Sequence, residues 1–169
     1  MYQPILDALI ARIDGGVCSE QLTDAVSILA SFKAEEPVVE RAYNRYLRDV
    51  CSAKVVQAAM TDADAAYHLL AMLEAMLEID CRDDFDAYML YMEWDREPEK
   101  RFYQPRRHVL YPIVQDLQDL YDDKLDFLSY STPPRVGKST LGCFFVSFVM
   151  GSHPERANVM SGFSDKLRS

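Results

Sequence analysis

The stretch "STPPRVGKST" (residues 131–140) decides the expected fold, because it joins two apolar segments and ends in a glycine, a lysine and two hydroxyl side chains. Before it, "KLDFLSYS" (124–131) is a short apolar run that predicts a buried strand. After it, "KSTLGCFFVSFVMG" (138–151) predicts a buried helix, and "ANVMSGFS" (157–164) predicts a second strand. A strand, a loop, a helix and a strand in this order form the opening unit of a parallel α/β sheet.

The end of this stretch matches most of a phosphate-binding loop of the form G-x-x-x-x-G-K-[ST]. Gly137, Lys138 and Ser139 occupy the last three positions, and Thr132 stands where the first glycine would be. In such a loop the lysine reaches the outer phosphates and the hydroxyl binds magnesium, so Ser139 is the expected Mg²⁺ ligand. The alternative is an ordinary turn between a strand and a helix that happens to carry a lysine.

The two prolines limit which backbone groups can surround a phosphate. Pro133 and Pro134 have no N–H to donate, so the donors must come from the residues that follow them. A guanidinium in the loop can also contact phosphate, which makes Arg135 a candidate. The expected phosphate ligands are therefore the N–H groups of Arg135, Val136, Gly137, Lys138, Ser139 and Thr140.

The first part of the chain has a different pattern, in which apolar residues recur at helical spacing. Apolar stripes at residues 5–13, 22–30, 39–50, 69–77 and 85–92 predict five helices, with turns near 15–16, 36–37 and 81–82. Ser19 and Thr61 are the expected N-caps of the second and fourth. "DREPEKRFYQPRRH" (95–108) is a charged, proline-containing connector, and residues 109–120 predict a further helix. We therefore expect a helical region over 1–95, then a connector and the first βαβ portion of an ATPase domain over 96–169.

Charge divides the chain near the same point. Residues 1–100 hold 20 acidic and 9 basic side chains, a net charge of −11, whereas residues 101–169 hold 7 and 9, a net charge of +2. The acidic first part is not typical of a nucleic-acid-binding surface. The second part can accept an anionic ligand.

Other residue classes point to structural roles. The four cysteines and three histidines are widely spaced and form no metal-binding motif. Asp83, Asp84 and Asp86 form an acidic cluster that we interpret as capping the start of a helix, in preference to a metal site. No run of about 18 apolar residues occurs, so no membrane span is expected.

At the level of motifs, "STPPRVGKST" resembles the modified phosphate loop of large terminase subunits, the ATP-driven DNA-packaging motors of tailed bacteriophages. In that family P-P-R-x-G-K-[ST] commonly replaces the glycine-first form. The segment before it, with aromatic, proline and basic residues, resembles the family's lead-in, and "ANVMSGFSDKL" (157–167) resembles its second strand. The resemblance covers residues 83–169 well and the helical first part weakly.

This resemblance implies an α-helical N-terminal region followed by the start of an α/β P-loop NTPase with an incomplete parallel sheet. It implies ATP and Mg²⁺ as ligands, with Lys138 and Arg135 in catalytic roles. By similarity, Tyr103 would stack on adenine, and Gln104 or Arg107 would bond to its edge. The alternative for "FYQPRR" (102–107) is that its aromatic residues pin the connector to the core.

The resemblance also implies partners and parts that this sequence does not contain. The implied partners are the small terminase subunit, the portal protein and double-stranded DNA, in the bacterial cytoplasm. The implied assembly of the complete subunit is a homo-oligomeric ring. The strand-end acid that orients water and the nuclease domain are not found by residue 169, so we expect an N-terminal portion that binds ATP without turnover. The alternatives are a non-catalytic helical interaction module and a truncated P-loop ATPase or kinase of another family.

Overall fold

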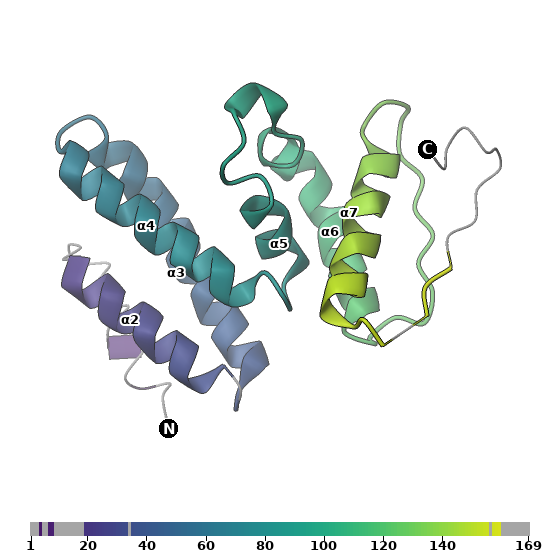
Figure 1. Ribbon diagram of the computed structural model, residues 1–169, viewed down its shortest axis with the longest axis horizontal. Coiled ribbons are helices and arrows are strands. Elements are labelled where there is room, and N and C mark those ends of the chain that lie inside the picture. Colours follow the sequence, from purple (N-terminus) through teal and green to yellow (C-terminus); the bar gives the residue numbers. More distant parts are fainter. Residues whose placement is uncertain (1–3, 5–6, 9–18, 34, 156, 160–169) are drawn as a thin grey trace. The chain divides into compact units, whose positions relative to one another are not determined.

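A computed structural model describes residues 4, 7–8, 19–33, 35–155 and 157–159. The protein divides into two compact units, Met1–Leu110 and Tyr111–Ser169. All regular structure in the described ranges is helical (Figure 1). The predicted division between residues 95 and 96 thus falls inside the first unit. The turn predicted at residues 15–16 and most of the helix predicted at 5–13 lie outside the described residues.

Three helices build the core of the first unit: α2 (Ser19–Phe32), α3 (Pro37–Ala58) and α4 (Ala63–Asp80). They run side by side in Figure 1 and contact one another. Apolar side chains spaced three or four residues apart give each helix one apolar face, and these faces meet. The buried cluster between them consists of Ala25, Leu29, Leu47, Cys51, Leu69 and Met76. The helical stripes predicted for these segments are confirmed.

The starts of the helices follow local chemistry. Ser19, predicted as an N-cap, is instead the first residue of α2, and α3 begins at Pro37, whose ring already fixes a helical φ angle. The predicted cap of α4 is wrong by one residue. Asp62 is the N-cap, and its carboxylate accepts the N–H groups of Asp64 and Ala65 at 3.1 Å each. The backbone of Asp62 is extended, which directs the carboxylate to these N–H groups.

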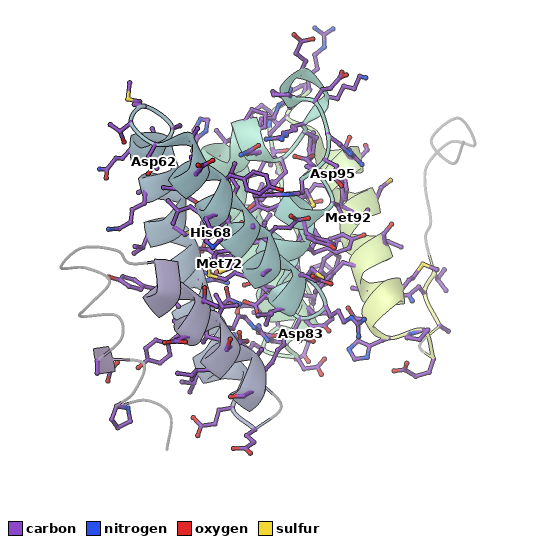
Figure 2. The ribbon with its side chains drawn as sticks, turned by 60° about the vertical axis from the view of Figure 1, so that its left-hand side comes forward. Asp62, His68, Met72, Asp83, Met92 and Asp95 are labelled. Carbon is purple, nitrogen blue, oxygen red and sulfur yellow. The ribbon has the colours of Figure 1, made fainter. Side chains whose placement is uncertain are left out.

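Beyond α4 the chain turns at residues 81–84 and forms the short helix α5 (Phe85–Tyr91). Figure 2 shows Asp62 at the start of α4 and Asp83 just beyond its end. Asp84 is the N-cap of α5 and accepts the N–H of Ala87 at 3.1 Å, which confirms the capping interpretation for Asp84. Two 3₁₀ turns follow, η1 (Pro98–Lys100) and η2 (Gln104–Arg106).

Helix α6 (Arg107–Tyr121) begins in the first unit and continues into the second, which also contains α7 (Lys138–Ser152). In the second unit the ring centroids of Tyr121 and Phe148 lie 4.7 Å apart, and Leu141 is buried on α7. Both helices are confirmed, the first predicted from apolar spacing and the second from its long apolar run. The prediction that the second helix is buried is wrong, because only Leu141 and Phe148 of α7 are buried.

The predicted parallel sheet is wrong. Within the described residues no strand forms, and residues 125–133 follow α6 without regular structure. Phe127 is 80% exposed and Val159 is 94% exposed, so the apolar runs that predicted buried strands are not buried. A strand also needs a hydrogen-bonded partner strand, and neither run has one in the described ranges. The expected start of an α/β P-loop NTPase is therefore not observed. Residues 160–164 of the second candidate strand lie outside the residues that the structure describes.

Among the residues that the structure describes, no helix combines the length and apolar composition needed to cross a membrane.

Candidate functional site

The loop before α7 adopts a conformation unusual for ordinary residues. Arg135 has a φ angle of 67° and Gly137 has one of 101°, both in the left-handed region. Glycine adopts this region without steric cost, whereas a residue with a Cβ does so at a cost. Alternation of left-handed and other backbone conformations turns successive N–H groups toward one side, which is how backbone nests hold anions.

Lys138 closes this loop. Its Nζ donates a hydrogen bond of 3.0 Å to the carbonyl oxygen of Thr132, six residues earlier. The bond joins the first helical residue to the position that the motif assigns to its first glycine, so it spans the whole candidate loop. The ammonium group therefore lies beside the loop backbone.

The N-terminal turn of α7 follows directly. Gly137 is the N-cap and supplies no side-chain hydrogen bond, so the first N–H groups of the helix have no side-chain cap. The side chains of Lys138, Ser139 and Thr140 are exposed. A helix N-terminus with exposed N–H groups and an adjacent ammonium favours an anion.

For magnesium, the loop offers the hydroxyl of Ser139 on the first turn of α7. Within the described ranges, no group of three or more His, Cys, Asp or Glu side chains is arranged to hold a metal ion. A Mg²⁺ ion at Ser139 would therefore take most of its ligands from phosphate and water, as it commonly does beside a nucleotide.

The predicted adenine contacts lie in the first unit, and Tyr103 is fully buried there. Its hydroxyl donates to Asp86 Oδ1 at 2.6 Å, and its N–H donates to Glu93 at 2.9 Å. Burial and the neighbouring Asp86 carboxylate raise the pKa of the Tyr103 hydroxyl. Stacking on a base would require this ring to leave its buried position. The geometry favours the other interpretation, in which the aromatic residue pins the connector to the core.

Arg107, the first residue of α6, binds the same carboxylate with two bonds. Its Nε lies 2.8 Å from Asp86 Oδ1 and its Nη2 lies 2.9 Å from Asp86 Oδ2. These bonds raise the pKa of Arg107 despite its partial burial. Arg107 therefore fixes the start of α6 against α5, and most of its donor capacity is directed at a protein group.

A second buried carboxylate, Asp84, accepts from two arginines of α3. Arg45 Nη2 lies at 2.9 Å and Arg48 Nη2 at 3.4 Å from Asp84 Oδ2. Burial alone would raise the pKa of Asp84, but Arg48 and Arg45 outweigh it and hold the pKa below its ordinary value. The cap of α5 is thus also the centre of an ion-pair network.

Glu93 holds the connector by its backbone, a role that the sequence analysis missed. It is 1% exposed, and its carboxylate accepts the N–H groups of Phe102 at 2.8 Å, Tyr103 at 2.9 Å and Gln104 at 3.1 Å. Three N–H donors replace the water that a buried carboxylate would lose. The only signal in the sequence is a charged residue between Met92 and Trp94 in an otherwise apolar segment.

A third buried cluster joins α3 to the end of α4. Asn44 Nδ2 donates to Glu40 Oε1 and to the Met76 carbonyl, each at 3.1 Å. Lys33 pairs with Asp80 at 3.1 Å. Burial, together with the nearby Asp80 carboxylate, raises the pKa of Glu40 to about 8. Glu40 therefore carries a proton at neutral pH, which lets two acidic side chains share the interior.

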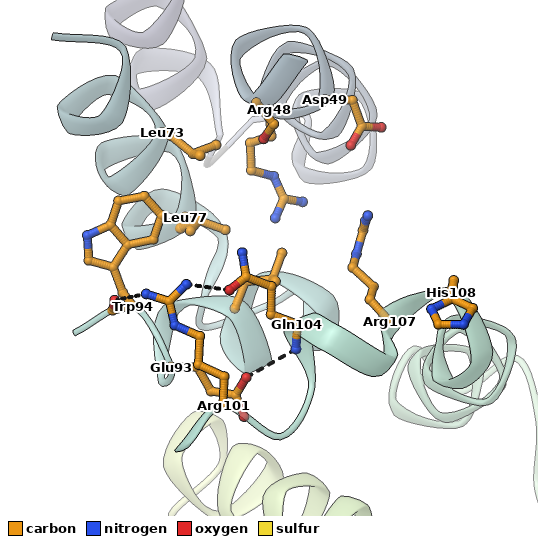
Figure 3. A pocket seen from close by; sticks show the side chains of 12 residues that line it. Arg48, Asp49, Leu73, Leu77, Glu93, Trp94, Arg101, Gln104, Arg107 and His108 are labelled. Atoms are coloured by element: carbon orange, nitrogen blue, oxygen red, sulfur yellow. Dashed lines mark hydrogen bonds between the residues drawn. The ribbon is translucent and has the colours of Figure 1, made fainter. Parts of the chain in front are cut away.

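A cavity of about 360 Å³ opens beside the connector (Figure 3). Gln104 and Arg107, both predicted adenine contacts, line it, whereas Tyr103 does not. The cavity also contacts Arg48 and Asp49 of α3, Leu73 and Leu77 of α4, and Trp94. The structure thus brings two of the three predicted base contacts together, and the phosphate-loop residues lie in the other unit.

In comparisons with known proteins, no family model, no curated protein and no solved structure matches this chain. The class that the described residues define is a helical protein.

Proposed function

We propose that residues 132–140 bind the phosphates of ATP with Mg²⁺. The observation that carries this proposal is the bond from Lys138 Nζ to the Thr132 carbonyl across a loop with left-handed residues at Arg135 and Gly137. An anion can replace this carbonyl as the partner of the ammonium without unfolding the loop. It would then meet the N–H groups at the start of α7.

Each residue has a distinct role in the proposal. Lys138 binds the outer phosphates, Ser139 binds Mg²⁺, and the N–H groups from Arg135 to Thr140 surround the phosphate oxygens. The Arg135 guanidinium adds a charge-assisted contact. Hydrolysis would also need a carboxylate that orients water, and residues 131–140 contain none, so the loop by itself supplies binding.

The wider role that we propose follows from the motif resemblance. A P-P-R-x-G-K-[ST] loop in a large terminase subunit serves ATP-driven packaging of double-stranded DNA, with a small subunit and a portal protein as partners. We propose the same setting for this chain, in the bacterial cytoplasm. The support is the loop sequence and the loop geometry; the proposal does not depend on a sheet.

Isothermal titration with MgATP tests the loop. We expect binding by the full chain and at least a tenfold loss in Lys138→Ala. Lys124→Ala is the matched control, because Lys124 is an exposed lysine of the same unit whose Nζ pairs with Asp119 and Asp122, away from the loop. Inorganic tripolyphosphate should compete with ATP, because the proposed contacts are to phosphate. Equal affinity of Lys138→Ala and the parent would contradict the proposal.

A second candidate is a helical interaction module. It is favoured by the first unit, which folds as helices with its own buried core and carries a cavity. The MgATP titration distinguishes the two candidates, since a module without a nucleotide site would bind no MgATP and Lys138→Ala would change nothing.

A further inference from the structure

The cavity of the first unit has an apolar wall and a wall of hydrogen-bond donors. Leu73, Leu77 and Trp94 form the apolar side. The opposite side is lined by Arg48, Gln104 and Arg107, and Figure 3 shows Arg48 extending toward the side of the cavity that carries Gln104 and Arg107. The volume of about 360 Å³ lies within the range of known ligand sites, which are mostly apolar with a few converging polar groups.

The donor wall contains groups whose capacity is unused. Arg48 is 4% exposed, and its Nε and Nη1 have no hydrogen-bond partner. The Oε1 of Gln104 accepts a bond from Arg101 Nη1. Because a guanidinium can only donate, this bond fixes the amide orientation and leaves Gln104 Nε2 as a donor for the cavity. Both Arg48 nitrogens are buried, so the guanidinium must turn toward the cavity to meet an acceptor there; because buried donors without partners are costly, such an acceptor would be stabilised.

The carboxylates around the cavity do not serve as acceptors for the unused donors of Arg48 and Gln104. Both oxygens of Glu93 accept backbone N–H groups. Asp84 pairs with Arg48 Nη2 at 3.4 Å, Asp86 pairs with Arg107 Nε at 2.8 Å, and Arg48 Nη1 is 3.9 Å from Asp86 Oδ2. Asp49 also lines the cavity, but its side chain is exposed at the rim. The donors are therefore arranged for one further anionic oxygen group.

A second hollow of about 590 Å³ continues from the first. It shares Ser52, Leu73, Trp94, Arg101 and Gln104 with the first cavity and adds an apolar surface on α3 and α4. On this surface Val56 is 68% exposed, Tyr67 is 75% exposed and Leu70 is 39% exposed. An apolar groove thus leads to a cluster of donors. The two hollows together are longer than a small organic acid would fill.

We propose that this groove binds the C-terminal end of a partner protein whose last residue is apolar. The terminal carboxylate accepts bonds from Gln104 Nε2 and the Arg48 guanidinium. The last side chain packs against Leu73 and Trp94, and the preceding residues lie on Val56, Tyr67 and Leu70. The carboxylate complements the donors in charge, and capture of a chain terminus by convergent donors is a known mode of peptide recognition.

Titration of the full chain with acetyl-Ala-Leu-Ala-Leu tests the carboxylate, with the fluorescence of the single tryptophan, Trp94, as the signal. We expect the free acid to bind at least tenfold more tightly than the same peptide with a C-terminal amide. Gln104→Glu keeps the side-chain length and the Arg101 contact but removes the donor, and it should weaken binding of the acid at least tenfold. Gln57→Glu is the matched control: it adds the same charge to an exposed glutamine outside the cavity and should leave binding unchanged.

Thermal unfolding first confirms that each variant is folded. Two further measurements then distinguish a peptide from a small acid or a nucleoside as the ligand of the groove. The peptide should bind more tightly than N-acetylleucine, and Tyr67→Ala should remove this advantage. Equal binding of acid and amide, an unaffected Gln104→Glu variant, or equal affinity for N-acetylleucine and the peptide would overturn the proposal. Displacement of the peptide by adenosine would place a base in the cavity and would overturn it as well.

Discussion

The two units use charged side chains in opposite ways. The first unit buries Glu40, Arg48, Asp84, Asp86 and Glu93, each at most 4% exposed. In the described part of the second unit the only buried polar side chain is Gln118, and the charged residues of the loop, Arg135 and Lys138, are exposed. Charges in the first unit therefore serve mainly the fold, whereas charges in the second are available to a ligand.

A conspicuous charged motif can therefore stabilise the fold or be open to a ligand, and the two units give one example of each. The acidic cluster at residues 83–86 and the basic segment at 102–107 bind each other, through Asp86 with Tyr103 and Arg107. The lysine of the loop instead binds a backbone carbonyl, a neutral acceptor that an anion can replace. Substitutions of the buried charges of the first unit should therefore change stability, whereas substitutions in the loop of the second should change ligand affinity.

The largest expected effect is on Asp84. Asp84→Asn keeps an oxygen that can cap Ala87 but removes the buried negative charge that Arg45 and Arg48 share, and it leaves Arg48 with only the more distant Asp86 at 3.9 Å. We expect a loss of about 4 kcal/mol in the free energy of unfolding. Urea unfolding followed by Trp94 fluorescence measures it, because Trp94 reports on the first unit.

Asp83→Asn is the matched comparison. Asp83 also pairs with a basic side chain, Lys33 at 3.1 Å, but its side chain is 42% exposed. Exposed pairs contribute little, so we expect a loss below about 1 kcal/mol. Similar losses in the two variants would show that burial of the network does not matter.

A second effect depends on pH. The pKa of Glu40 is about 8 in the folded protein and 4.5 in its ordinary state. Between these values only the folded state holds the proton, so stability is fully present below pH 4.5 and falls until about pH 8. The slope is on the order of 1 kcal/mol per pH unit.

Glu40→Gln imitates the protonated side chain and should remove this slope. Urea unfolding at several pH values between 5 and 9 compares the variant with the parent. The two should have similar stability at pH 5, and the variant should be the more stable at pH 9. Parallel pH profiles would rule out a shared proton between Glu40 and Asp80.

The smallest expected effect concerns Arg135. Arg135→Gly removes the guanidinium but allows the left-handed backbone at no steric cost. We expect MgATP affinity to fall by about 1 kcal/mol at low salt, through the lost charge-assisted contact. The difference should shrink at high salt, because the group is exposed and screened. Titrations at two salt concentrations measure this, and equal affinities of parent and variant at low salt would remove Arg135 from the site.

The helices were predictable because their signals are local. Apolar spacing located α2 to α6, the length of the apolar run at residues 138–151 located α7, and Asp84 was recognised among the residues that cap a helix. Apolar content misled the prediction at residues 124–131, where Leu125 and Phe127 are exposed and no partner strand is described. A strand depends on residues far away in the chain, so a single apolar run does not determine one.

The candidate sites were predictable to different degrees. Lys138 and Gly137 were found from a short motif whose residues all lie within one loop. The partners of Tyr103 and Arg107 were not found, because Asp86 precedes them by 17 and 21 residues and nothing local links them. The burial of Glu93 and Glu40 was missed for the same reason, since charged residues are normally exposed.

The binding of phosphate by residues 132–140 is tested most directly by amide chemical shifts in ¹H–¹⁵N NMR spectra during titration with MgATP. We predict that the amides from Arg135 to Thr140 shift in a saturable way, and that the same shifts are absent in Lys138→Ala. Amides of the buried core of the first unit, such as those of Leu47 and Met76, should not move. Unchanged amides from Arg135 to Thr140 at saturating MgATP would contradict the proposal and leave the loop as an ordinary turn.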